Sequence, residues 1–194
     1  EQNKILTPKF IYLKTKNLDE NKIINIKKVF SKFIIKPIKS GSSFGIKIIR
    51  NNKDFKLLIR NIKNFKRELK NHQEILIEEF ISGRELTVST LKFNRKIEAL
   101  AVTEIKTKNI FFDYKAKYSK GYAKHILPAR LGKKEYNQCL NIAVKCHKIL
   151  GCKSLARTDF ILGSKNNKLY YLETNTQPGL TPISLLPEQA KYKN

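Results

Sequence analysis

The sequence predicts a mixed α+β protein of two lobes, built mainly from antiparallel strands. Short runs of alternating or β-branched residues recur along the 194 residues and are separated by turn residues. Strand–loop–strand patterns of this kind form hairpins. Two longer stretches, 53–70 and 134–150, carry apolar residues at three- and four-residue steps, which is the spacing of a helix. We expect the lobes to comprise residues 1–83 and 84–194.

The first lobe alternates between strand and turn signals. Pro37 ends an apolar strand pattern, and the small residues at 40–45 lead into a β-branched run, which predicts a hairpin. A further strand pattern ends at the Ser82-Gly83 turn. The expected elements are strands at 10–13, 33–36, 46–49 and 74–80 and a helix at 53–70.

The second lobe begins with a pattern in which Leu86, Val88 and Thr90 share one face of a strand. Residues 110–129 are long and irregular, and loops of that length in compact domains are usually functional. Gly151 is placed to end a helix. The expected elements are strands at 85–92, 96–105, 156–162 and 168–174, a helix at 134–150, and a short final helix that starts with Thr181 as N-cap and Pro182 as first residue.

The net charge of +24 would ordinarily indicate nucleic acid or an anionic membrane as partner. However, the basic residues are 33 Lys and only 7 Arg, spread along the whole chain, whereas Arg is the preferred residue for phosphate and base recognition. Lys, Ile and Asn share A/T-rich codons and make up 74 of the 194 residues. We therefore interpret the charge as compositional bias, and expect neither a nucleic-acid nor a membrane partner.

The cysteines Cys139, Cys146 and Cys152 are odd in number and form no C-x-x-C pair, which indicates a reducing compartment and a cytoplasmic protein. Their spacing with His147 matches no common zinc pattern. The longest apolar runs are far short of a membrane span.

Acidic residues are scarce, so their positions are informative. Asp159 lies on one predicted strand, and Glu173 and Asn175 lie on the next. Antiparallel pairing across the short turn would bring Asp159 and Glu173 together, and carboxylate and amide oxygens suit Mg²⁺. The alternative is a cross-strand salt bridge with Arg157 and polar edges of a hairpin.

Two further segments could contact a nucleotide. The loop 40–45 is rich in small residues whose N–H groups can surround an anion, with Lys36 on the strand before it. It does not fit a Walker A motif, and a plain hairpin turn is the alternative. The strand at 75–81, followed by Glu85, could bind adenine through its backbone and ribose through the carboxylate, although an edge strand with charged ends would look the same.

Taken together, these segments resemble the D-alanine–D-alanine ligases, a branch of the ATP-grasp superfamily. The resemblance extends in family order from about residue 5 to the end. It is carried by FIIKP at 33–37, GSSFG at 41–45, IEEFISGRELTV at 77–88, DYKAKY at 113–118, LGC at 150–152 with RTDF at 157–160, LETNTQPGLTP at 172–182 and SL at 184–185.

The resemblance implies an ATP site formed by residues of both lobes. Lys36 and Lys117 would contact the phosphates, Ser43 would cover them, Glu78, Glu79, Phe80 and Ile81 would line the adenine pocket with Phe111 against the ring, and Glu85 would hold the ribose.

The resemblance also implies a metal and substrate site. Asp159, Glu173 and Asn175 would bind two Mg²⁺, with Mn²⁺ as a substitute. Arg157 and the Gly179 amide would stabilise the oxyanion, Ser42 and Tyr118 would orient each other near the first D-alanine, and Ser184 and Leu185 would hold the carboxylate of the second. Tyrosine at 118 favours D-alanine as second substrate over D-lactate.

The implied activity is ATP-dependent ligation of two D-alanines through an acyl phosphate, for peptidoglycan synthesis, by a homodimer. The alternatives are another ATP-grasp carboxylate–amine ligase and a nucleotide-binding remnant without ligase activity. The family carries an additional N-terminal domain, which we expect to be missing from this chain, as the absence of any methionine also indicates. We expect the isolated chain to bind nucleotide at best and to be inactive.

Overall fold

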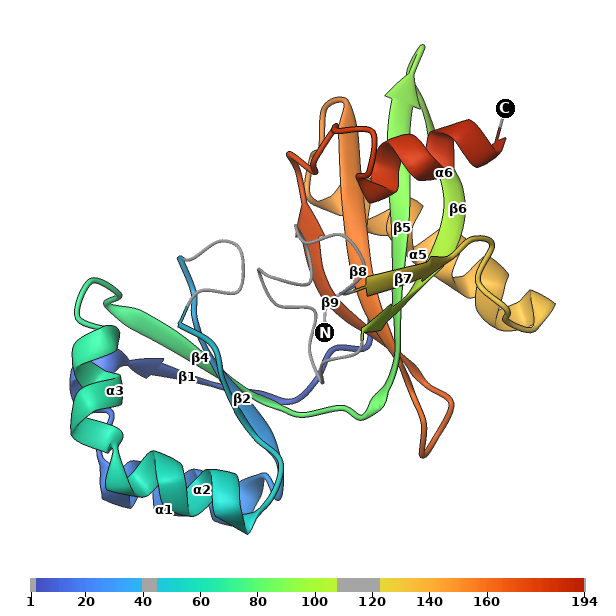
Figure 1. Cartoon of the computed structure of the whole chain (residues 1–194). Helices are drawn as coiled ribbons and strands as arrows, with labels where there is room; N and C mark the ends of the chain where they lie inside the picture. The colour runs from blue at the N-terminus through green and yellow to red at the C-terminus, as the bar shows by residue number, and fades with distance from the viewer. Residues whose placement is uncertain (1–2, 40–44, 108–122, 194) are drawn as a thin grey trace. The chain divides into compact units, whose positions relative to one another are not determined.

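The computed structural model describes residues 3–39, 45–107 and 123–193. They form two compact units, one of Pro8–Ile81 and one of Glu1–Thr7 with Ser82–Asn194 (Figure 1). The prediction that the first lobe is the central ATP-grasp lobe and the second carries the metal and substrate residues stays a prediction. Within the described part of the chain, no helix is both long and apolar enough to cross a membrane.

The Pro8–Ile81 unit contains a four-stranded antiparallel sheet. Its strands are β1 (Phe10–Lys14), β2 (Phe33–Pro37), β3 (Lys47–Ile49) and β4 (Glu74–Glu79), in the order β1-β4-β2-β3. The predicted hairpin around the small-residue loop is formed, because β2 pairs with β3. β4 lies between β1 and β2, so its residues are paired on both sides.

Helices cover one face of this sheet. They are α1 (Glu20–Val29), α2 (Asn52–Arg60) and α3 (Ile62–Glu68), and with the sheet they enclose a core that includes Ile26, Phe33, Leu58 and Ile77. The single helix expected at 53–70 is wrong, because it is divided at Asn61. The Asn61 side-chain amide donates to the Leu57 carbonyl at 3.0 Å, a local bond that competes with the helical backbone.

The other unit contains a five-stranded sheet in the order β7-β6-β5-β8-β9, with every pair antiparallel. Its strands are β5 (Gly83–Phe93), β6 (Lys96–Thr107), β7 (Ala123–Ile126), β8 (Leu155–Gly163) and β9 (Leu169–Asn175). Asn94 and Arg95 form the predicted β5–β6 turn, both with positive φ. β7 was not expected, since it lies within the stretch predicted to be irregular.

Two helices lie on opposite faces of this sheet, α5 (Lys133–Ile149) and α6 (Leu185–Lys193). Leu86 and Val88 pack towards α5, as the alternation predicted. Thr87 and Ser89 on the other face are also fully buried, because α6 covers them. The middle of β5 is therefore buried on both faces, and the face that α6 covers carries polar side chains.

The predicted start of the last helix is wrong. α6 begins at Leu185, and Thr181 instead belongs to a turn in which its carbonyl accepts from the Ser184 N–H at 2.8 Å. The hydroxyls of Thr181 and Ser184 are also 2.8 Å apart. Their mutual bond means that Thr181 does not act as the N-cap.

Candidate functional site

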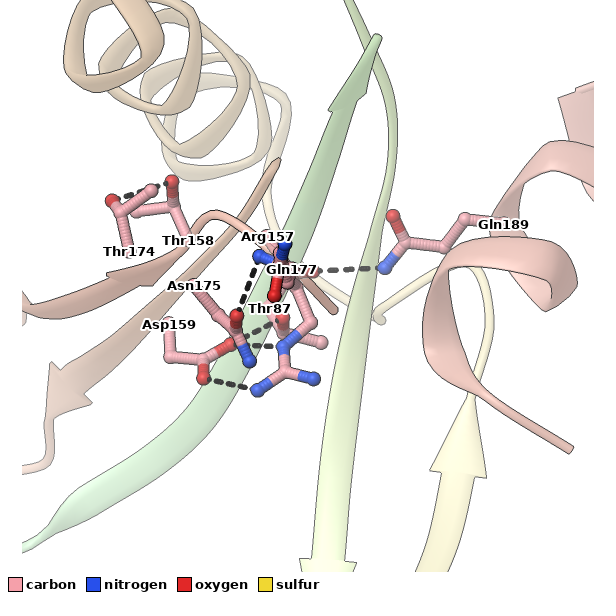
Figure 2. Close-up of polar contacts among 8 residues, drawn as sticks. All are labelled: Thr87, Arg157, Thr158, Asp159, Thr174, Asn175, Gln177 and Gln189. Carbon is pink, nitrogen blue, oxygen red and sulfur yellow. Dashed lines mark hydrogen bonds and ion pairs between the residues drawn. The ribbon is translucent and has the colours of Figure 1, made fainter. Parts of the chain in front are cut away.

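The hairpin of β8 and β9 brings four predicted site residues to one face. Asp159 is the direct register partner of Glu173, and Arg157 is the partner of Asn175. Figure 2 shows Arg157, Asp159 and Asn175 close together. Directly opposed residues on antiparallel strands point to the same side, as do residues two apart on one strand. The register shifts just after Asp159, where Phe160 pairs with Tyr171 and Leu172 is an extra residue. A β-bulge of this kind is common beside functional sites.

Arg157 and Asp159 form a bidentate ion pair. Arg157 Nε and Nη2 donate to Asp159 Oδ1 and Oδ2 at 3.0 and 2.9 Å, and the two side chains are only 13% and 14% exposed. Burial alone would lower the pKa of Arg157, but the charge and hydrogen bonds of Asp159, together with the charges of Glu173 and Glu85, hold it above its ordinary value. Arg157 is therefore a fixed cation surrounded by three carboxylates.

The third bond to Asp159 comes from β5. Thr87 is its register partner there, and the Thr87 hydroxyl donates to Asp159 Oδ1 at 2.6 Å. A carboxylate offers about four lone-pair sites, so three donors leave room for one further ligand. The Asp159 carboxylate is thus held in one orientation, and one of its lone-pair sites stays free for a further ligand.

Glu173 and Asn175 complete the set. The Glu173 side chain is exposed, and it forms no ion pair with any residue that the structure describes. The Asn175 amide oxygen accepts from the Gln177 N–H at 2.9 Å, which fixes the amide in a local turn. Two carboxylates and an amide are hard oxygen ligands, so these residues fit Mg²⁺. The set contains only two acids, in keeping with the finding that residues 3–39, 45–107 and 123–193 hold no metal-binding group of three or more His, Cys, Asp or Glu.

In the Pro8–Ile81 unit, Lys36 and Glu78 form an ion pair. Lys36 Nζ is 2.8 Å from Glu78 Oε2, and the side chains are 24% and 11% exposed. The Glu79 and Phe80 N–H groups donate to the Lys9 and Lys32 carbonyls at 2.8 and 3.0 Å. Those two N–H groups are therefore occupied within the unit, so any backbone contact to adenine would use other atoms of the segment.

Gly179 lies against Ser184. A Cβ built on Gly179 would be 2.8 Å from Ser184 Oγ, so any other residue would displace the serine. The Leu185 side chain is buried in the core, which leaves only its main chain to contact a ligand. The amide predicted to stabilise an oxyanion and the residues predicted to hold a carboxylate are thus neighbours.

Glu85 lies on β5, two residues before Thr87 and on the same face of the strand. Its charge raises the pKa of Arg157, so it belongs to the surroundings of that guanidinium. Ser42, Ser43, Phe111, Lys117 and Tyr118 lie outside the described residues.

A hollow of about 820 Å³ in the Pro8–Ile81 unit is lined by none of the predicted site residues. Its lining is mostly basic and includes Lys14, Lys16, Lys63, Lys66, Arg67 and Lys70. Basic side chains are therefore grouped more closely around this hollow than an even spread along the chain would give. The absence of a nucleic-acid partner stays a prediction.

The fold matches solved structures of ATP-grasp enzymes. The chain superposes over 98% of its length on 53% of the VanG D-Ala:D-Ser ligase of Enterococcus faecalis, with a TM-score of 0.76 and 28% identity. It also superposes over its full length on 57% of D-alanyl-alanine synthetase A of Vibrio cholerae, with a TM-score of 0.82 and 23% identity. The two-unit α+β architecture is therefore the ATP-grasp fold.

Sequence comparison assigns the family. The model of the D-ala D-ala ligase C-terminus matches residues 1–193. The chain is 42% identical over 198 residues to the D-alanine–D-alanine ligase of Pelagibacter ubique, covering 99% of this chain and 59% of that protein, and 44% identical over 161 residues to that of Rickettsia typhi, covering 82% and 47%. The chain belongs to the D-alanine–D-alanine ligase C-terminal family, and it spans about half the length of these curated relatives.

Sequence reasoning missed two residues of the site region, Thr87 and Gln189. Gln189 is fully buried and bonded to β5 and β6. The signal for Thr87 was its place on the strand face opposite Leu86 and Val88. Gln189 gave none, since glutamine on a short surface helix is ordinarily solvated.

Proposed function

We propose that this chain forms the ATP- and metal-binding part of a ligase that joins two D-alanines through an acyl phosphate, for peptidoglycan precursor synthesis. One observation carries the proposal. In a chain of this family, Arg157 and Asp159 lie directly opposite Asn175 and Glu173, so a cation and three oxygen-bearing side chains share one face of the hairpin. Such a face suits a transferring phosphoryl group and the metal that accompanies it.

The chemistry follows from the substrates. A carboxylate is a poor electrophile, so one oxygen of the first D-alanine attacks the γ-phosphorus of ATP and ADP leaves. The amine of the second D-alanine then attacks the acyl carbon and loses a proton. The bond between the acyl carbon and the phosphate oxygen breaks, and the released phosphate keeps the oxygen that came from the first D-alanine. Water must be kept out, because an acyl phosphate hydrolyses.

The residues of this chain take roles according to their charge and support. Lys36 would contact the ATP phosphates from the end of β2. Arg157, oriented by Asp159, would face the oxygen that becomes negative in the tetrahedral intermediate, together with the Gly179 amide. The turn at Ser184 and the first amide of α6 would hold the carboxylate of the second D-alanine.

Asp159, Glu173 and Asn175 would hold two Mg²⁺ ions through their carboxylate and amide oxygens. When bound, the metal would neutralise phosphate charge during transfer. The bidentate bonds from Arg157 and the bond from Thr87 prevent the Asp159 carboxylate from rotating. This pre-organisation is the contribution of the chain itself.

The second substrate differs among proteins of similar sequence or fold. Relatives are named as D-alanine–D-alanine ligases, whereas a solved neighbour of 28% identity is named as a D-Ala:D-Ser ligase. Another carboxylate–amine ligase therefore remains the second candidate. A panel of D-alanine, D-serine and D-lactate as second substrates would separate the two candidates.

We further propose that the ligase is a cytoplasmic homodimer, and that this chain alone binds nucleotide without ligating. Light scattering of the full-length gene product tests the dimer, and localisation of a tagged copy tests the compartment. Dipeptide synthesis by the 194-residue chain would contradict the expected inactivity.

The test of the function is phosphate release by the full-length gene product with ATP and Mg²⁺. We expect release that depends on D-alanine and is not supported by L-alanine. Release that is independent of any D-amino acid would contradict the proposal.

A further inference from the structure

A buried amide joins α6 to β5, the strand whose Thr87 donates a hydrogen bond to Asp159. Gln189 on α6 is fully buried. Its Oε1 accepts from the Ser89 N–H at 2.7 Å, and its Nε2 donates to the Thr87 carbonyl at 3.2 Å and to the Thr103 hydroxyl at 2.9 Å. Both donor hydrogens of the amide and one acceptor site are therefore used inside the protein.

The bridge sits at a break in the β5–β6 ladder. Val88 pairs with Val102 and Thr90 pairs with Ala99, so Ser89 alone faces two residues of β6. A bulge of this kind leaves backbone groups without ladder partners. The carboxamide of Gln189 replaces a peptide group of the neighbouring strand there. It accepts from the Ser89 N–H and donates to the Thr87 carbonyl, as a strand partner would. A buried N–H left without a partner would be destabilising, so the Ser89 N–H needs this acceptor.

Thr87 connects this bridge to the candidate metal site. Its carbonyl accepts from Gln189, and its hydroxyl donates to Asp159 at 2.6 Å. In Figure 2 the Gln189 side chain reaches from α6 to Thr87, and Asp159 lies on the far side of Thr87. The same helix begins at Leu185, directly after Ser184. The beginning of α6 and the Asp159 carboxylate are therefore joined through two side chains.

We propose that Gln189 is a positioning residue, which fixes the Asp159 carboxylate relative to the start of α6 by holding the Thr87 main chain at the bulge. The role of this link rests on the proposed function, in which Asp159 binds the metal and the start of α6 binds the second D-alanine. The link would keep these two groups at a fixed separation. The link itself concerns only residues of one unit. Helix packing alone would hold α6 on the sheet but would not orient Thr87.

The experiment uses the whole 194-residue chain without metal or nucleotide. The ¹³C NMR signal of the Asp159 carboxylate is compared among Gln189→Leu, Gln189→Glu and Leu186→Ala. Gln189→Leu conserves volume and removes all three bonds, and Gln189→Glu keeps only the acceptor. Leu186 is a buried α6 residue whose apolar side chain makes no hydrogen bond to Thr87, so its truncation removes helix packing and keeps all three Gln189 bonds. We expect both Gln189 variants to move the signal and Leu186→Ala to leave it in place.

A double variant isolates the route. In a Thr87→Val background the hydroxyl link is already absent, so Gln189→Leu should produce no further shift. An unmoved Asp159 signal in a folded Gln189→Leu or Gln189→Glu chain would overturn the inference, as would an equal shift in Leu186→Ala.

Metal affinity separates this inference from the proposed function. With nucleotide present, Mn²⁺ binding followed by electron paramagnetic resonance should weaken about tenfold in Gln189→Leu and remain unchanged in Leu186→Ala, as is typical of residues that orient metal ligands. A wild-type chain that binds no Mn²⁺ but shows the NMR shift would contradict the metal assignment and leave the Gln189 link standing.

Discussion

Arg157 donates two hydrogen bonds of almost equal length, 3.0 and 2.9 Å, to the carboxylate of Asp159, which lies two residues further along the same strand. Successive residues of a strand alternate faces, so this spacing places the guanidinium directly beside the carboxylate. The pair is largely buried. It therefore has the fixed geometry that the proposed role of Arg157 requires, and loss of either partner would leave a buried charge unpaired.

Arg157→Lys should retain the charge but lose the two-pronged geometry, because an ammonium cannot donate two parallel bonds. We expect D-alanine-dependent phosphate release by the full-length protein to fall about a hundredfold, with correct folding by circular dichroism. Arg84→Lys is the matched control, since Arg84 makes a similar two-bond pair with Glu104 in the same unit. Equal losses in the two variants would contradict a special role for Arg157.

Glu173→Ala should abolish turnover, because it removes the exposed carboxylate opposite Asp159. Mn²⁺ binding should fall by at least about tenfold. Glu98→Ala makes the same charge change on an exposed residue of β6 and should leave both readouts unchanged. Near-normal activity in Glu173→Ala would show that the metal assignment is wrong.

Gly179→Ala should impair ligation, because the added Cβ would fall 2.8 Å from Ser184 Oγ and displace the turn before α6. The KM for the second D-alanine should rise more than the KM for ATP. Gly132→Ala would meet only the carboxylate end of the Glu135 side chain, which can turn aside, and should be tolerated. If the two substitutions have the same effect on KM, the packing at Gly179 has no special role.

His147 should make stability depend on pH. Burial lowers its pKa, the charge of Lys92 lowers it further, and a backbone hydrogen bond at Cys152 opposes both. An unfolded chain has the ordinary pKa of about 6.5 and binds the proton first as pH falls. The contribution to stability is thus complete above about pH 6.5 and is lost below it. Urea unfolding between pH 7 and 5.5 should show this slope, and His147→Asn should flatten it; an unchanged slope in the variant would contradict the assignment.

Local pattern predicted much of the site. The short turn between 156–162 and 168–174 was enough to place Asp159 beside Glu173, because alternation and turn length together determine which residues of a hairpin oppose each other. Asn94 and Arg95 similarly identified the β5–β6 turn. These features depend on residues close together in the sequence.

Features that depend on distant residues could not be predicted. Thr87 bonds Asp159 across 72 positions, and Gln189 bonds Ser89 across 100. Nothing local indicates which strands become neighbours, or that a glutamine will occupy a bulge. The division at Asn61 was missed for another reason, since the apolar spacing continues through it, and the bond of its side-chain amide to the Leu57 carbonyl has no signal in that spacing.

The central claim is ligation through an acyl phosphate, and isotope transfer tests it most directly. The full-length protein would be given ATP, Mg²⁺ and D-alanine labelled with ¹⁸O in the carboxylate, and the released phosphate analysed by mass spectrometry. We predict one ¹⁸O atom in each phosphate, because the oxygen that attacks ATP leaves with the phosphate. Release of unlabelled phosphate would contradict the account.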